Sequence, residues 1–141
     1  MEEDSKAMAS AGSYGRRVHF KPRGKMDGKT LASIMNAAMS QAVQNLIQGG
    51  TLLGHFKAIA TTEEGFVKIS LIDPVIGAEA EDNVSSKDVG EGVINIMAAV
   101  AGRTDEEVKR AVENCISILA RYLWIEENKQ MTCANRILEP R

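Results

Sequence analysis

Two segments with the alternating pattern of β-strands, joined by a four-residue turn, constrain the fold of this chain most. In the segment 66–73, apolar residues at every second position alternate with polar ones, as expected for a strand with one buried face. The apolar positions are Val67, Ile69 and Leu71. The preceding turn, 62–65, ends in a glycine that can adopt a positive φ. The sequence therefore predicts an antiparallel hairpin of residues 51–61 and 66–73.

Two long segments have apolar residues at helical spacing and residues suited to capping a helix. Asp27 can accept hydrogen bonds from the open amides of a helix over about 28–48. Thr104 and Glu107 form a capping box, which predicts a second helix over about 105–125. Both segments are amphipathic, so each predicted helix has one face for the core.

The segment 88–101 predicts a third, buried helix. Asp88 and Glu91 have the spacing of a capping box, and the residues from 93 to 101 are apolar on almost every side of a helix. Asn95 is the one polar side chain in that stretch, so we expect it to fix the helix register or an interface. A short strand is predicted at 16–21.

These elements give the order β-α-β-β-α-α and predict an α+β fold, with a small antiparallel sheet and the helices packed on one face. We expect a disordered tail over 1–14, a single α+β domain over 15–125 and a C-terminal tail over 126–141. Two amphipathic helices and a buried third have more apolar surface than a three-stranded sheet easily covers. Oligomerisation would cover the remainder.

Composition excludes several classes of protein. The 141 residues are 44% hydrophobic and 26% charged, which is ordinary for a globular domain and excludes a wholly disordered chain. No run of 18 apolar residues is present, and the first residues lack the pattern of a secretory signal. The two cysteines are too few for a disulfide framework. The sequence therefore predicts a cytoplasmic protein that does not contact a membrane.

The net charge of −2 conceals a separation of charges along the chain. The segment 15–29 has six basic residues and one acidic residue, whereas 63–92 has eight acidic residues and two basic ones. Two such segments either bind each other, bind an outside partner, or form two solvated surfaces.

The basic arm, residues 16–25, is the candidate site for a nucleic acid or another anion. Clustered cations bind phosphates, and a neighbouring Phe20 or His19 offers a ring for a base to stack on. The candidate residues are Arg16, Arg17, Lys21, Arg23 and Lys25. Only 4% of the chain is aromatic and it contains no known nucleic-acid motif, so docking on the acidic segment is the competing interpretation.

The first predicted helix has an unusual polar face, because residues 31–48 include no charged side chain. Small and amide side chains allow close approach without burying a charge, so this face is a candidate subunit interface. The interface candidates are Asn36, Ser40, Gln41, Gln44 and Gln48. The alternative is an exposed helix face that happens to be uncharged.

A catalytic site has only weak candidates. His55 lies in the first hairpin strand and shares a face with Lys57 and Ile59, and Asp73 ends the neighbouring strand. A histidine with a structural hydrogen bond is the competing interpretation. The histidines and cysteines do not have the spacing of a zinc site, and no cofactor is indicated.

Taken together, these features favour a non-enzymatic, homo-oligomeric accessory or regulatory protein that acts by binding a partner. The first alternative is an RNA- or DNA-binding regulator that uses the basic arm. The second alternative is a small enzyme with a site near His55 at a subunit boundary.

Overall fold

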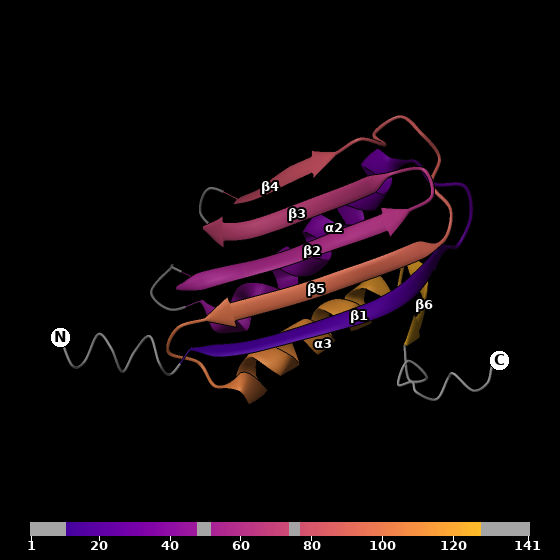
Figure 1. Cartoon of the computed structure of the whole chain (residues 1–141). Coiled ribbons are helices and arrows are strands. Elements are labelled where there is room, and N and C mark those ends of the chain that lie inside the picture. The colour runs from indigo at the N-terminus through magenta and orange to yellow at the C-terminus, as the bar shows by residue number, and fades with distance from the viewer. Residues whose placement is uncertain (1–10, 48–51, 74–76, 128–141) are drawn as a thin grey trace.

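The computed structural model describes residues 11–47, 52–73 and 77–127, which form one six-stranded antiparallel sheet and two helices (Figure 1). In chain order the elements are β1 (Gly12–Pro22), α2 (Gly28–Ala42) with the 3₁₀ turn η1 (Val43–Leu46), β2 (Gly54–Thr62), β3 (Phe66–Asp73), β4 (Gly77–Asp82), β5 (Gly92–Val100), α3 (Asp105–Leu119) and β6 (Leu123–Glu127). The strands lie in the order β4-β3-β2-β5-β1-β6.

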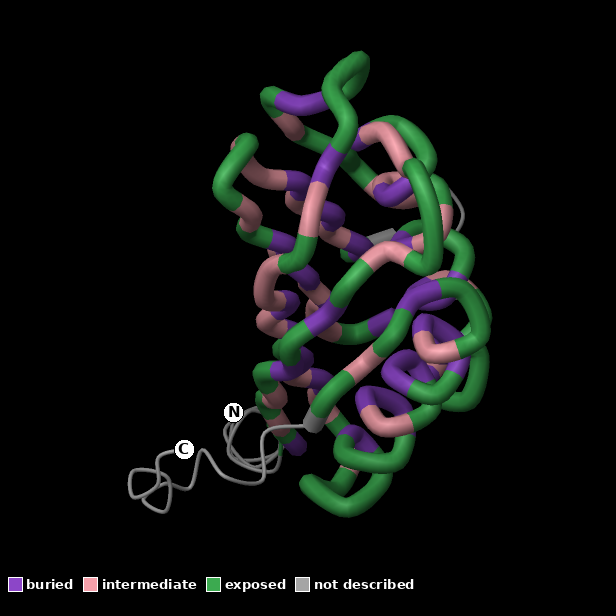
Figure 2. The backbone as a smooth tube through the Cα atoms, turned by 90° about the vertical axis from the view of Figure 1, so that its right-hand side faces the viewer, coloured by how far each residue is buried: buried purple, intermediate pink, exposed green. Residues whose placement is uncertain are grey.

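Both helices lie behind the sheet in the view of Figure 1, with α3 behind β1 and α2 further towards β3. Buried positions alternate with more exposed ones along the strands (Figure 2). Val18 and Phe20 of β1 and Ile94 and Ile96 of β5 belong to the core cluster that these strands share with the helices. The core therefore lies between the sheet and the two helices. No helix in the described residues is long and apolar enough to cross a membrane.

The predicted antiparallel hairpin is confirmed, and it is formed by β2 and β3. Its strands pair from Phe56 with Leu71 to Thr61 with Phe66. In the turn, the Thr62 amide donates to the Gly65 carbonyl oxygen over 2.8 Å. Gly65 has a φ of 151°, and a Cβ on it would collide with the Asn83 side chain, so both the backbone conformation and the close approach require glycine.

The predicted starts of the two long helices are also confirmed. The Asp27 carboxylate accepts a hydrogen bond from the Thr30 amide over 2.9 Å at the start of α2. The Thr104 hydroxyl accepts from the Glu107 amide over 3.1 Å, and the Glu107 carboxylate accepts from the Thr104 amide over 2.9 Å. This capping box opens α3, which ends at Leu119, six residues before the predicted end of that helix.

The predicted helix over 88–101 is wrong, because residues Gly92–Val100 form the strand β5. β5 lies between β1 and β2 and pairs with both along its full length. Ile94, Ile96, Ala98 and Val100 face the core, while the residues between them lie on the other face and are partly shielded by neighbouring strands. The sequence of a central strand of this kind is a continuous apolar run, and the sequence of a buried helix has the same appearance. Asn95 is a half-buried residue of this strand.

The predicted order β-α-β-β-α-α is corrected to β-α-β-β-β-β-α-β. The additional strands are β4, in the acidic segment 63–92, and β6, which starts at Leu123 inside the predicted last helix and extends to Glu127. β1 begins at Gly12, so the strand includes the end of the segment 1–14 that was expected to be a tail.

The segment 83–91 docks on the start of α2 and links the acidic and basic parts of the chain. The Gly28 amide donates to the Lys87 carbonyl oxygen and the Val89 amide donates to the Met26 carbonyl oxygen, both over 2.9 Å. A Cβ on Gly28 would collide with the Val84 backbone, so glycine permits this close approach. Backbone hydrogen bonds, and not charge alone, therefore hold the segment 83–91 against residues 26–28 at the start of α2.

Candidate binding surface on the sheet

The face of the sheet that points away from the helices is the candidate functional surface, and it is named here the uncovered sheet face because neither helix of the described residues packs on it. Its side chains are half-buried or exposed, and they alternate with the buried side chains of the core. Its central part includes Arg17, His19 and Lys21 of β1, Val93, Asn95 and Met97 of β5, and His55, Lys57 and Ile59 of β2. Towards the two edges it includes Lys68, Ser70 and Ile72 of β3, Glu79 and Glu81 of β4, and Trp124 and Glu126 of β6.

Charges on the uncovered sheet face are ordered across the strands. One row of paired positions contains, from β4 to β1, Glu81, Lys68, Ile59, Asn95 and Arg17. Within the strands, the acidic residues of this face lie on the edge strands β4 and β6, and the basic residues lie on the strands between them. A surface with both signs of charge favours a partner that also has both signs.

Large apolar side chains are exposed on the same face. The described residues include five exposed large apolar side chains, and Ile72, Met97 and Trp124 lie on this face with 59%, 43% and 56% exposure. Such side chains at the centre and edges of an uncovered sheet are typical of a surface that binds another molecule.

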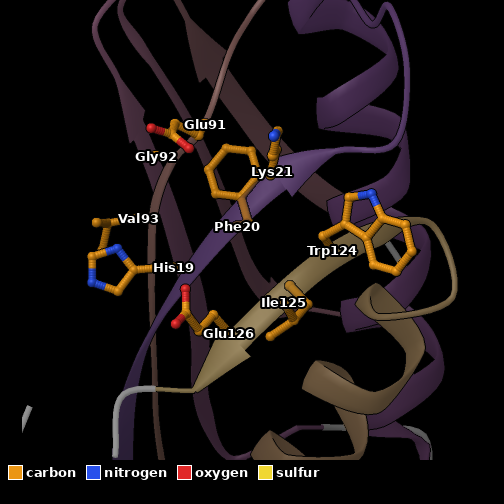
Figure 3. Close-up of a pocket in the computed structure, with 9 residues that line it drawn as sticks. All are labelled: His19, Phe20, Lys21, Glu91, Gly92, Val93, Trp124, Ile125 and Glu126. Atoms are coloured by element: carbon orange, nitrogen blue, oxygen red, sulfur yellow. The ribbon is translucent and has the colours of Figure 1, made fainter. Parts of the chain in front are cut away.

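A pocket of about 500 Å³ lies at one corner of the uncovered sheet face, above β1 (Figure 3). His19 of β1 lines it and pairs in register with Val93 on one side and with Glu126 on the other. Lys21 pairs with Trp124 of β6, and Glu91 completes the wall just before β5. The pocket is large enough for a small ligand or a few side chains of a partner.

Trp124 is held in place by the residue that follows β1. The Arg23 guanidinium carbon lies 3.9 Å from the centroid of the Trp124 ring, and Arg23 also donates a hydrogen bond of 2.8 Å to the Ala120 carbonyl oxygen. The cation–π contact and the hydrogen bond together fix the guanidinium over the indole. The ring is thus positioned at the pocket and remains half exposed.

The structure separates the five cations of the basic arm. Arg17 and Lys21 lie on the uncovered sheet face, whereas Arg16, on the opposite face of β1, forms an ion pair with Glu113 of α3. Lys25 lies 3.6 Å from Asp88 in an exposed pair, which contributes little to stability. Arg23 lies on Trp124, so the arm does not form one cluster, and only the Lys25 pair joins its side chains to the acidic segment among the described residues.

The polar face of α2 and of the turn η1 that follows it, named here the α2 face, is exposed, as the prediction of an interface requires. Asn36, Gln41 and Gln44 are exposed, Ser40 is half-buried, and Gln48 lies outside the described residues. The Gln44 side-chain amide donates to the Ser40 carbonyl oxygen over 3.1 Å, and the Ser40 hydroxyl contacts the Asn36 side-chain oxygen over 3.3 Å. The prediction that the helices have uncovered apolar surface is wrong, because the six-stranded sheet covers the buried face of α2.

His55 lies on the uncovered sheet face, which it shares with Lys57 and Ile59 as the alternation in β2 predicted. It borders a shallow hollow of about 300 Å³ with Met97 and Ala99, and its Nδ1 atom is buried without a hydrogen-bond partner among the described residues. Asp73 ends β3, where its backbone pairs with Gly77, and its side chain is not described. A catalytic pair of these residues remains a prediction.

Other reactive groups are few in the described residues. Burial raises the pKa of the Cys115 thiol to about 12, so this cysteine stays protonated at neutral pH and is a poor nucleophile. Cys133 lies outside the described residues. No group of three or more His, Cys, Asp or Glu side chains is placed to bind a metal ion in the part of the chain that the structure describes.

Sequence reasoning missed Trp124 and the basic residues of β2 and β3. Trp124 is the only tryptophan of the chain, and it alternates with Leu123 and Ile125 as an exposed residue of an edge strand does. That alternation spans only a few residues, so the sequence pattern extended the predicted helix over it.

Comparisons with protein-family models, with curated proteins and with solved structures gave no match to this chain.

Proposed function

We propose that this chain is a non-enzymatic, homo-oligomeric accessory or regulatory protein that acts by binding a partner protein. The observation that carries the proposal is the uncovered sheet face, which combines three exposed large apolar side chains with charges of both signs. An antiparallel sheet can expose one polar face to water, but exposed Ile72, Met97 and Trp124 make this face better suited to a partner.

A second copy of the chain fits the uncharged face of α2. In a two-fold symmetric contact, residues near the axis meet their own counterparts. Charged side chains would repel each other there, whereas the amides of Asn36, Gln41 and Gln44 both donate and accept hydrogen bonds and can pair with themselves. The charged outer face of α3, with Glu106 and Arg110, lacks this property.

The partner on the uncovered sheet face is proposed to be a protein rather than a nucleic acid. Glu79 and Glu81 on one edge and Glu126 on the other would repel a phosphate backbone that crossed the strands. A protein surface can offer acidic groups to Arg17, Lys57 and Lys68 and basic groups to these edges.

The homo-oligomeric part is tested by sedimentation equilibrium on the full chain. We expect a dimer at tens of micromolar for the natural sequence. The double variant Gln41→Glu, Gln44→Glu places like charges in the contact, so we expect its dimer dissociation constant to rise at least tenfold. A monomeric natural chain, or a double variant with unchanged affinity, would contradict the proposed role of α2.

The matched control is Thr61→Glu, which introduces the same side chain at an exposed position on the uncovered sheet face. It leaves α2 unchanged, so we expect its dimer affinity to equal that of the natural chain. Circular dichroism of all three proteins establishes that they are folded. Weakening by the control as strong as that by the double variant would show that the α2 face is not the contact.

A further inference from the structure

We propose that the pocket above β1 binds a basic side chain of an extended peptide segment that pairs with the edge strand β6. This deepens the proposed function in one respect, because it gives the chemistry of the partner segment. It does not depend on whether the chain forms a dimer through α2.

The charge of the pocket favours a cation. Glu91 and Glu126 lie on opposite walls, whereas Lys21 is the one lysine or arginine in the lining. In the described residues neither carboxylate forms a salt bridge or a side-chain hydrogen bond, so both are available to a ligand. A lysine or arginine from a partner would thus enter a partly enclosed space whose two carboxylates have no other side-chain partner among the described residues.

Trp124 adds an aromatic surface that attracts cations. Trp124 is one of the residues that line the pocket, and Arg23, whose guanidinium carbon lies 3.9 Å from the centroid of its ring, is not part of the lining. Trp124 remains 56% exposed in spite of this contact, so part of its side chain is accessible to a ligand. A cation that enters beside Glu126 gains both the carboxylate and the indole.

The edge position of β6 explains why an extended peptide fits better than a free amine. β6 is the last strand of the sheet and pairs only with β1 among the described strands, so its outer backbone edge can accept another strand. A peptide added there places alternate side chains on the two faces of the sheet. One set would lie beside Trp124 and Glu126, and the other set beside the half-buried Ile125.

The segment is therefore expected to alternate basic and apolar residues. Basic residues would point into the pocket, and apolar residues would pack beside Ile125 on the core side. Glu126 also discourages pairing between the β6 edges of two copies where the C-terminal ends of the two strands overlap, because like charges then approach each other. This repulsion favours a partner of opposite charge over a second copy at this edge.

The fluorescence of Trp124 provides the test, because it is the only tryptophan of the chain. The full chain is titrated with the peptide Ac-Gly-Lys-Val-Lys-Val-Gly-NH₂, with the same peptide carrying Glu in place of Lys, and with single-stranded oligothymidine. We expect a saturable change in emission with the lysine peptide, and at least tenfold weaker binding of the glutamate peptide. Preferential response to the glutamate peptide or to oligothymidine, or no response to any probe, would overturn the inference.

Two carboxylate variants separate the pocket from general attraction to an acidic protein. Glu126→Gln is expected to weaken binding of the lysine peptide at least fivefold, and Glu91→Gln provides a second variant if the first does not fold. The control Glu81→Gln removes the same charge from the opposite edge of the same face and is expected to leave affinity unchanged. Equal weakening by the control would overturn the inference.

The two proposals fail separately. If the chain is a dimer and its Trp124 emission does not change with the lysine peptide, the proposed peptide site is refuted but the α2 contact is not. A monomer that binds the lysine peptide with the expected dependence on Glu126 refutes the homo-oligomer and retains the pocket.

Discussion

Truncation of two residues on β5 measures how differently the two faces of the sheet are buried. Ile94 is fully buried on the core face, and Met97 is 43% exposed on the uncovered sheet face. In a helix, positions three apart would share one face, so both truncations would have similar effects. In the strand, the two positions lie on opposite faces and their effects must differ.

The sizes of the two effects follow from burial. Ile94→Ala removes a fully buried side chain and leaves a cavity, which costs about 3 kcal/mol. Met97→Ala removes a side chain with nearly half its surface already in water, and no closed cavity forms, so the cost is about 1 kcal/mol. With a shift of about 4 °C per kcal/mol for a chain of this length, Ile94→Ala should lower Tm by about 12 °C and Met97→Ala by about 4 °C.

Thermal and urea unfolding, followed by circular dichroism, measure both variants against the natural chain. The expected result is a free-energy loss for Ile94→Ala that is about three times that for Met97→Ala. Equal losses would refute the assignment of residues 92–100 to a strand with one core face, and a larger loss for Met97→Ala would refute the assignment of the uncovered face.

Three further predictions concern local features. Thr104→Ala removes one half of the capping box of α3 and should cost about 1 kcal/mol in urea unfolding, and an unchanged midpoint would show that the cap does not stabilise the helix. Backbone amides lower the pKa of Glu107 and Glu64 below 4.5, and the Ser85 hydroxyl lowers the pKa of Asp82 below 3.8. The stabilisation of the fold by these three ionised carboxylates is present at pH values above their ordinary pKa values, and it is lost as pH falls through their lower folded-state pKa values. The urea midpoint should therefore fall as pH is lowered from 5 to below 3.8, with a smaller fall for Glu107→Gln, and a midpoint that rises towards acid pH would contradict this sign. Cys115 should react with iodoacetamide only after unfolding, which peptide mass spectrometry can follow, and rapid reaction in the native chain would contradict its burial.

Local signals in the sequence predicted the elements that are stabilised locally. Asp27 and Thr104 cap their helices through hydrogen bonds within three residues, and the hairpin closes through a four-residue turn. These interactions need no knowledge of the remaining chain. The start of each helix and the β2–β3 hairpin could therefore be predicted, whereas the last residues of α3 could not, because β6 begins within the same apolar pattern.

The segment 92–100 shows why the centre of the sheet was mistaken for a helix. Val93 and Met97 lie on the uncovered sheet face but are apolar, so the alternation expected for a strand is lost. Pairing with β1 and β2, whose sequence positions are distant, makes the segment a strand in the folded chain. The β-branched residues and the glycines at 92 and 102 were the signals that favoured a strand over a helix.

Strand alternation also explains what was right and wrong about the candidate site. His55 shares a face of β2 with Lys57 and Ile59, as predicted, because its strand was correctly predicted. The basic arm was treated as one cluster, although alternation along β1 sends Arg16 towards α3 and Arg17 to the uncovered sheet face. Trp124 could not be assigned to the surface without the strand β6, which sequence periodicity did not reveal.

Light scattering coupled to size-exclusion chromatography, at low and at high salt, tests the central claim most directly. The proposed contact through α2 is uncharged, so the account predicts twice the mass of one chain at tens of micromolar in both 0.05 and 0.5 M NaCl, conditions that differ strongly in charge screening. A monomer at both salt concentrations, or a dimer that dissociates as salt is raised, would contradict the claim that the chain self-associates through this face.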